Sequence, residues 1–213
     1  ELVEALPAGT GRAVVNAADP MSLTAAEGAS LAARGVTTVL YDGSGQASAD
    51  DAPVAAALGA SEHVWAEDVR LDEEGRPSFT LCAVGFAEES NGRTAAQETL
   101  FDRIPERCPC TVGLQGLHNV ANACAAASVA RSLGMPLPQI AAALAEALPE
   151  SGRQEVLRAR NGATVVNDAY NANPDSMRAS LATFCARQVR GARYAVLGDM
   201  GELGSYADAC HRA

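Results

Sequence analysis

The sequence predicts an α/β protein in two parts, residues 1–149 and 150–213. Short apolar stretches typical of buried strands alternate with alanine-rich stretches typical of helices, and this alternation favours a parallel sheet covered by helices. The segment Pro149-Glu150-Ser151-Gly152 then breaks the pattern, and a second series of strands and helices starts after it. We therefore expect a parallel sheet with a small antiparallel sheet in the first part, and an incomplete second α/β domain.

The first part opens with the pattern of a β-α-β unit. Residues 11–16 have the composition of a buried strand, and residues 36–41 that of a second one. Between them Thr24, with Glu27 three positions later, predicts the N-cap of a helix that ends before Arg34-Gly35. A helical crossover of this kind joins parallel strands through a right-handed connection.

Residues 62–112 have a different character, which is typical of an antiparallel sheet. Short apolar stretches alternate there with acidic, glycine-rich turns, and the expected strands are 63–69, 78–84 and 110–114. The polar stretch 87–98 is expected to be a loose hairpin loop. Two alanine-rich helices follow, at 117–133 and 138–148.

The second part begins with a predicted hairpin. Its expected strands, 155–159 and 163–167, flank an Asn-Gly turn, which is a strong hairpin signal. The elements expected after it are a helix capped by Asp175 or Ser176 and reaching about Val189, a buried strand at 194–197, a loop at 198–205 and a last helix. Because that helix is cut short at Ala213, we expect the second domain to be truncated.

Composition and charge exclude several function classes. The formal charge is −10 with a pI near 4.7, whereas nucleic-acid binding normally requires a basic face. No apolar stretch approaches the ~20 residues that span a bilayer, and the first residues lack the features of a signal peptide. We expect a cytoplasmic protein with reduced cysteines, no nucleic-acid partner and no membrane insertion.

Lysine is absent, since all sixteen basic residues are arginine. The chain therefore contains no Schiff-base lysine, no phosphate-loop lysine and no carbamylated lysine. The six cysteines show no disulfide framework, and only Cys108-Pro109-Cys110 with His118 suggests metal ligation. Because a second ligand pair is missing, we expect no metal site.

Two polar loops are candidate binding sites. The segment 167–175 lies between a strand end and a helix start, where open α/β sheets bind ligands, although the same residues also suit a plain capping loop. The loop 198–204 is expected at the same sheet edge. Its carboxylates, Asp199 and Glu202, would suit a cationic amine or Mg²⁺, unless Asp199 only caps a helix and Glu202 is solvated.

Other candidates lie near the boundary between the two parts. Asn119 and Asn122 share a face of the predicted helix 117–133, and a primary amide can both donate to and accept from an adenine edge. Arg153 follows the break and would suit a phosphate if the two parts close on each other, but an arginine there is ordinarily solvated. His118 is more often structural than catalytic.

Together these segments resemble the Mur ligase family. The join between that family's central and C-terminal domains is similar to Gly116-Leu117-His118-Asn119-Val120-Ala121-Asn122, followed by alanines and then by Gly152-Arg153. Residues 168–177 and 196–204 resemble the MurF branch in particular. Val15-Asn16-Ala17-Ala18-Asp19 is similar to another family stretch, although Ala18 stands where an aspartate is usual. The resemblance is strongest after Gly113 and weakest over 54–111.

The resemblance implies an enzyme of peptidoglycan synthesis with a Rossmann-like C-terminal domain. Such ligases phosphorylate the terminal carboxylate of UDP-N-acetylmuramoyl-tripeptide with ATP and Mg²⁺, and the amine of D-alanyl-D-alanine then attacks the acyl phosphate. By position, Asn119 and Asn122 would contact adenine, Asp168 the ribose and Tyr170 the base or ribose. Arg153 would contact the terminal phosphates, where a guanidinium can follow the developing charge. Asn173 and Asp199 would flank the incoming amine.

The resemblance also implies what these residues lack. The family's phosphate loop and carbamylated lysine are expected upstream of Glu1, so residues 1–149 would be the later portion of the central ATP-binding domain, and 150–213 the first portion of the C-terminal domain. We expect this chain alone to be an inactive monomer that binds ATP weakly. The alternatives are another family member, similar to folylpolyglutamate or cyanophycin synthetases, and a non-catalytic nucleotide-binding module. Asn171-Ala172-Asn173 argues against the first, because those branches usually carry histidine there.

Overall fold

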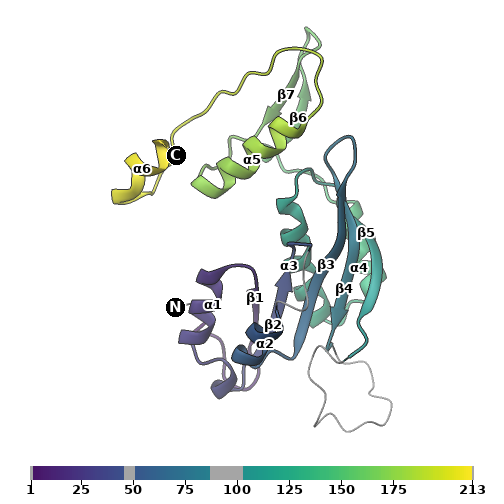
Figure 1. Cartoon of the computed structure of the whole chain (residues 1–213), viewed down its shortest axis with the longest axis vertical. Coiled ribbons are helices and arrows are strands. Elements are labelled where there is room, and N and C mark those ends of the chain that lie inside the picture. Colours follow the sequence, from purple (N-terminus) through teal and green to yellow (C-terminus); the bar gives the residue numbers. More distant parts are fainter. Residues whose placement is uncertain (1, 46–50, 87–102, 213) are drawn as a thin grey trace.

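A computed structural model describes residues 2–45, 51–86 and 103–212 (Figure 1). The first part is built on one five-stranded sheet in the order β1-β2-β3-β4-β5. Its strands are β1 Arg12–Asn16, β2 Thr37–Asp42, β3 Glu62–Leu71, β4 Pro77–Val84 and β5 Glu106–Thr111. The predicted α/β class is confirmed.

The opening β-α-β unit has parallel strands, as predicted, but its helix begins earlier than expected. β1 pairs in parallel with β2, and α1 runs Pro20–Gly28 between them. Asp19 is the N-cap, because its carboxylate accepts from the backbone N–H groups of Met21 and Ser22. The prediction of Thr24 was wrong, since its hydroxyl donates to the carbonyl of Pro20 inside the helix. An aspartate before proline at the first helical position was the better cap.

The antiparallel strands do not form a sheet of their own. β3 pairs in parallel with β2 on one side and antiparallel with β4 on the other, which joins both arrangements into one surface. The third antiparallel strand, β5, lies at residues 106–111 rather than at 110–114, and it forms the outer edge of the sheet with Pro109 inside it. The loop expected at 87–98 lies outside the described residues.

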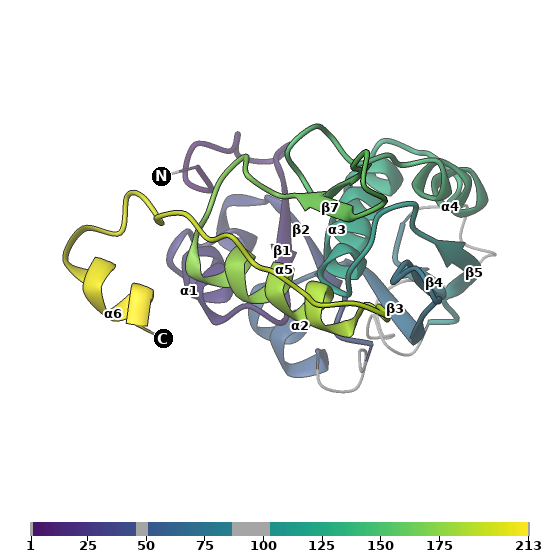
Figure 2. The ribbon, with the colours of Figure 1, turned by 90° about the horizontal axis from the view of Figure 1, so that it is seen from above.

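Helices cover the two faces of this sheet (Figure 2). On one face α3 (His118–Ser132) and α4 (Leu137–Ala145) enclose a core that includes Val64 and Leu81; on the other, α1 and α2 (Ala52–Leu58) enclose a core that includes Trp65. The two alanine-rich helices were predicted, although α4 ends before Leu148. The helix α2 was not predicted.

The second part is a hairpin followed by two helices. β6 (Glu155–Arg158) and β7 (Thr164–Asn167) pair antiparallel around the predicted Asn-Gly turn. The helix α5 runs Pro174–Ala186 with Asn173, rather than Asp175 or Ser176, as its N-cap. The short helix α6 (Ala207–Arg212) lies at the end of a long extended segment (Figure 1).

The predicted strand at 194–197 was wrong. Those residues form no strand, and the side chains of Tyr194 and Val196 are 83% and 98% exposed. An apolar stretch becomes a strand only when a neighbouring strand satisfies its backbone groups, and among the described residues β6 and β7 pair only with each other.

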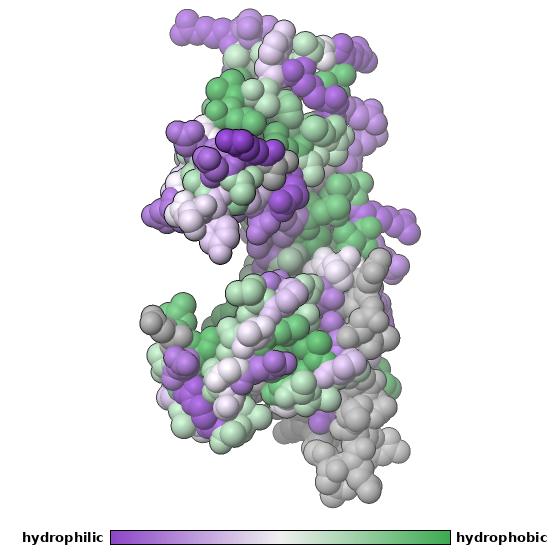
Figure 3. All heavy atoms as spheres, turned by 60° about the vertical axis from the view of Figure 1, so that its left-hand side comes forward, coloured by the Kyte–Doolittle hydropathy of each residue, from purple (hydrophilic) through white to green (hydrophobic). Residues whose placement is uncertain are grey.

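The two parts form separate lobes that meet beside the start of α3. Figure 3 shows the surface hollowed between the lobe of the five-stranded sheet and the lobe that carries α5 and α6. Arg187, which follows α5, donates to the side-chain oxygen of Gln115, which lies just before α3. No helix among the described residues is long and apolar enough to cross a membrane.

Candidate functional site at the junction of the two lobes

Arg153 lies in a turn that is tied to the end of β7. The backbone N–H of Tyr170 donates to the carbonyl of Gly152 at 3.0 Å, and the N–H of Gln154 donates to the carboxylate of Asp168 at 3.1 Å. The guanidinium carbon of Arg153 lies 3.9 Å from the centre of the Tyr170 ring, a cation–π contact. Three of the predicted site residues, Arg153, Asp168 and Tyr170, therefore form one cluster.

The two asparagines of α3 are adjacent, as their spacing predicted. Asn119 is buried, and its side-chain amide donates to the carbonyl of Gln115 at 2.8 Å. The exposed Asn122 donates to the side-chain oxygen of Asn119 at 3.1 Å. Asn119 thus orients Asn122, and Asn122 is the member of the pair that a ligand at the junction can reach.

His118 lies at the start of α3, near enough to the Arg153 cluster for the charge of Asp168 to act on it. Burial lowers the pKa of His118, and the nearby negative charge of Asp168 opposes that change. Gly116 lies beside it with a φ of +101°, and a Cβ there would come within 2.8 Å of both His118 Nδ1 and Thr183 Oγ1 on α5. Glycine suits position 116 because its φ lies in the left-handed region, and because side chains from both lobes come close to it.

The residues expected to flank an amine are not brought together. The side-chain oxygen of Asn173 accepts from the N–H of Ser176 at 2.8 Å, and Ser176 Oγ accepts from the N–H of Asn173, which is a capping box. Asp199 is exposed in the extended segment before α6. Without a strand at 194–197, no sheet edge aligns the loop 198–204 with the end of β7.

The loop 198–204 is folded onto α6 instead. The N–H of Met200 donates to His211 Nε2 at 2.9 Å, and His211 Nδ1 lies 2.8 Å from the carbonyl of Ala207. Glu202 is exposed, with a φ of +61°. Among residues 2–45, 51–86 and 103–212, no three His, Cys, Asp or Glu side chains gather as metal ligands.

Two features near the site were not predicted. Gly43, just after β2, lies so close to α3 that a Cβ there would come within 2.3 Å of Ala121 Cα, which places the end of β2 against the first turn of α3. Glu155, the first residue of β6, accepts hydrogen bonds from the turn that holds Arg153. A charged residue at the first strand position, separated by one residue from Gly152-Arg153, was the signal in the sequence for the second feature.

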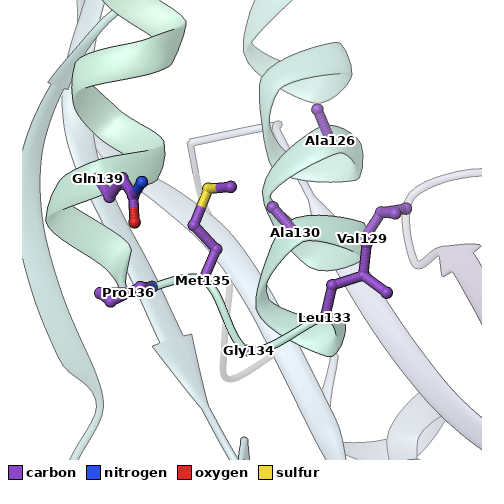
Figure 4. A pocket seen from close by; sticks show the side chains of 8 residues that line it. All are labelled: Ala126, Val129, Ala130, Leu133, Gly134, Met135, Pro136 and Gln139. Atoms are coloured by element: carbon purple, nitrogen blue, oxygen red, sulfur yellow. The ribbon is translucent and has the colours of Figure 1, made fainter.

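A separate apolar groove lies away from this cluster. It is open, has a volume of about 600 Å³ and runs between the end of α3 and the start of α4, where Val129, Leu133 and Met135 line it (Figure 4). None of the predicted site residues lies in it, so its lining gives no support to their roles.

Comparison with known proteins agrees with the motifs at the junction. Residues 152–213 match the family described as "Mur ligase, glutamate ligase domain". The UDP-N-acetylmuramoyl-tripeptide--D-alanyl-D-alanine ligase of Mycobacterium tuberculosis H37Rv is 38% identical over 216 aligned residues, which cover 99% of this chain and 34% of that protein. The protein of the same name from Escherichia coli K12 is 40% identical over 98 residues, which cover 46% of this chain and 21% of that protein.

Solved structures of Mur ligases have a fold similar to that of this chain. MurF from Acinetobacter baumannii is similar with a TM-score of 0.61 and 25% identity, over 94% of this chain and 34% of that one. MurF from Thermotoga maritima, in complex with ADP, is similar with a TM-score of 0.58 and 20% identity, over 96% of this chain and 37% of that one. This chain thus spans about a third of the length of the relatives that it matches along its whole length. It belongs to the Mur ligase family and resembles the MurF members of that family.

Proposed function

We propose that this chain supplies part of the nucleotide site and part of the amine site of an ATP-dependent ligase. The reaction would join D-alanyl-D-alanine to UDP-N-acetylmuramoyl-tripeptide for cell-wall synthesis. The names of the relatives support this substrate pair, and the ADP complex of the Thermotoga maritima protein supports an adenine nucleotide. The setting would be the cytoplasm, with the ligase acting as a monomer on small molecules.

Each of the two lobes would belong to a different domain of the ligase. Residues 1–149 would belong to a central ATP-binding domain, and residues 150–213 to a C-terminal domain that binds the amine. Two observations support a boundary near 150. The family match begins at residue 152, and the core clusters of the first lobe contain no residue beyond Leu144.

The observation that carries the proposal is the cluster of Arg153, Asp168 and Tyr170 at the turn between the lobes. Asn122, oriented by Asn119, would contact the adenine edge. Asp168 would accept from the ribose hydroxyls, and Tyr170 would lie against the base or ribose. Arg153 would leave the face of Tyr170 and contact the terminal phosphates, where a guanidinium offers a bidentate pair of donors.

The amine half of the reaction would use the other lobe. A carboxylate oxygen of the tripeptide attacks the terminal phosphorus of ATP, and ADP leaves. The amine nitrogen of D-alanyl-D-alanine then attacks the acyl carbon, phosphate leaves, and the amine gives up a proton. Asn173 and Asp199 would flank that amine. The Asp199 carboxylate would attract it as an ammonium, which loses one proton before the nitrogen attacks, in addition to the proton given up on forming the amide. The segment before α6 would have to move for both to reach it.

The described residues do not fit a magnesium site of their own. Asp168 already accepts from Gln154, and no three candidate ligands gather around it or around Asp199. Mg²⁺ prefers one or two carboxylates together with phosphate oxygens and water. We propose that Mg²⁺ reaches this chain only together with the nucleotide, and we assign it no ligand here.

The test is isothermal titration with ATP and Mg²⁺. It compares the 213-residue chain with a longer version that includes the segment encoded upstream of Glu1. The proposal expects the longer version to bind clearly more tightly. Arg153→Ala and Asp168→Ala are each expected to weaken that binding about tenfold or more, because each removes a charge-assisted contact.

The matched control is Arg158→Ala. Arg158 is an exposed arginine on β6 whose guanidinium donates to Thr164, away from the cluster. If it weakens ATP binding as much as Arg153→Ala does, general charge rather than the cluster is responsible. If neither version binds ATP, the nucleotide role is wrong and a different binding function replaces it.

A further inference from the structure

Glu155 receives three hydrogen bonds on one carboxylate oxygen. Its Oε2 accepts from Ser151 Oγ at 3.1 Å, from the backbone N–H of Gly152 at 3.2 Å and from the side-chain amide of Asn167 at 3.2 Å. The first two donors belong to the turn between the lobes, and the third belongs to the end of β7. One side chain therefore joins the turn to the hairpin.

These donors come directly before the two charged residues of the candidate site in the chain. Ser151 and Gly152 directly precede Arg153, and Asn167 directly precedes Asp168. Glu155 and Asn167 also face each other in the β6–β7 ladder, so the side-chain bond reinforces a backbone pairing. Fixing the distance between Gly152 and Asn167 fixes the distance between the backbones of Arg153 and Asp168.

The residue after Arg153 is held in an uncommon conformation. Gln154 has a φ of +52°, which a residue with a side chain adopts rarely and only when its surroundings hold it there. Its N–H is held by Asp168 on one side, and Glu155 holds the turn on the other. The direction in which the Arg153 side chain leaves the backbone depends on this conformation.

The three donors hold the ionised form of Glu155. Hydrogen bonds from Gly152 and then from Ser151 lower the pKa of its carboxyl group below the usual value, so the side chain is a carboxylate at neutral pH. A carboxylate oxygen can accept several hydrogen bonds at once. An amide in its place can still offer an oxygen to the donors, but without the charge.

We propose that Glu155 is a positioning residue, which holds the turn so that Arg153 lies over Tyr170 in the nucleotide-free chain. Glu155 itself would touch neither nucleotide nor substrate. The hydrogen bonds that hold the turn belong to this chain alone, whereas the presentation of Arg153 to phosphates rests on the function proposed above.

The test is NMR of the ligand-free chain, read at the Arg153 side chain. Protons of an arginine stacked 3.9 Å from a tyrosine ring are shifted upfield by the ring, and Tyr170→Leu identifies that shift by abolishing it. Glu155→Ala is expected to remove most of the shift and to speed amide exchange at Gly152 and Gln154. Glu155→Gln is expected to restore at least half of the shift, because its amide oxygen can still accept.

The control is Glu150→Gln, which carries the same change of charge. Glu150 lies three positions before Arg153 and forms an exposed ion pair with it at 3.6 Å, but its side chain does not hold the turn to β7. It is expected to leave the ring shift unchanged. An equal loss of shift in this variant, or an unchanged shift in a folded Glu155→Ala variant, would overturn the proposal.

Nucleotide titration separates this proposal from the function on which it rests. Both hold if Glu155→Ala removes the ring shift and also weakens ATP binding by the longer version several-fold, with partial rescue by Glu155→Gln. If the shift is lost but ATP binding is unchanged, Glu155 positions Arg153 while the phosphate role of Arg153 is wrong. Circular dichroism confirms that each variant is folded before either result is interpreted.

Discussion

At the scale of single residues, the cysteines divide into buried and accessible groups. Burial raises the pKa of the Cys82 and Cys110 thiols to about 12, and it also raises the pKa of Cys124. At pH 8 a thiol with a pKa near 12 is a thiolate in only about one molecule in 10⁴. Cys185 is exposed to solvent.

We therefore expect thiol reagents to modify Cys185 first. With iodoacetamide at pH 8, mass spectrometry should show rapid alkylation of the peptide that contains Cys185, and alkylation of Cys82, Cys110 and Cys124 only after denaturant is added. Cys185→Ser should remove the fast phase. A fast reaction at Cys124 in the folded chain would contradict the structure.

Substitutions at the two asparagines of α3 should have different effects, one mainly on the free energy of unfolding and the other mainly on nucleotide binding. Asn119→Ala removes a buried amide and leaves the carbonyl of Gln115 without that donor, so we expect a loss of about 1–2 kcal/mol in urea unfolding. Asn122→Ala is exposed and should cost less than about 0.5 kcal/mol, yet it should weaken nucleotide binding if the proposed adenine contact is real. The opposite order of stabilities would show that the two roles are reversed.

The sequence predicted relations between single residues only where they lie a few positions apart, within the reach of a local pattern. The spacing of Asn119 and Asn122 predicted that they share a helix face, and the hydrogen bond between their side chains agrees with it. The stacking of Arg153 on Tyr170 joins residues seventeen positions apart through two turns, and no local pattern encodes it. The N-caps were predicted wrongly for a different reason. Asp19 and Thr24 both have side chains that suit an N-cap, and only the path of the backbone selects between them.

At the scale of elements, the contact between β2 and α3 depends on a missing side chain. A Cβ at Gly43 would overlap the backbone of Ala121, which cannot yield without moving α3. Gly43→Ala should therefore destabilise the chain by about 2 kcal/mol or more in denaturant unfolding. Gly28→Ala is the control, because nothing lies within 4 Å of its Cβ position at the end of α1. It should be neutral or slightly stabilising; an equal loss in both variants would contradict the close approach.

The start of α5 depends on its capping box. Asn173→Ala removes the side-chain oxygen that accepts from Ser176, and we expect a loss of about 1 kcal/mol together with faster amide exchange in the first turn of α5. Asn171→Ala is the control, since the side chain of Asn171 accepts from the N–H of Ala172 within the loop and does not cap α5. Unchanged exchange in the Asn173 variant would show that proline at the first helical position suffices.

Elements with strong local signals were predicted, and elements defined by their neighbours were not. The β6–β7 hairpin followed from Asn161-Gly162, which suits a tight turn whatever surrounds it. The stretch 194–197 had a strand's composition but lacks a partner strand. β3 pairs in parallel on one side and antiparallel on the other, and its composition cannot show which neighbour lies where. α2 is only seven residues long, too short for a periodic pattern to emerge.

At the scale of the whole molecule, the two lobes differ in how much they bury. Two core clusters support the five-stranded sheet, whereas α5 contains no buried residue and the apolar side chains of β6 are about 40% exposed. Local stability follows buried apolar contact. The second lobe should therefore open far more readily than the first.

Hydrogen exchange read by mass spectrometry should show this difference directly. Peptides from residues 155–186 should exchange at least tenfold faster than peptides from β3, β4 and α3 in the same chain. In denaturant, the second lobe should lose its structure before the Trp65 signal of the first lobe changes. Equal protection in both lobes would mean that contacts such as Gln115 with Arg187 couple them into one cooperative unit.

The outer position of β5 limits how copies of this chain can associate. An exposed edge strand can recruit another strand and so start aggregation, unless its row of backbone donors is interrupted. Pro109 has no N–H and lies inside the six residues of β5, opposite Thr80. Replacing it with valine would complete the row of donors, and the chain would then be expected to form intermolecular sheet at concentrations where the original stays dispersed.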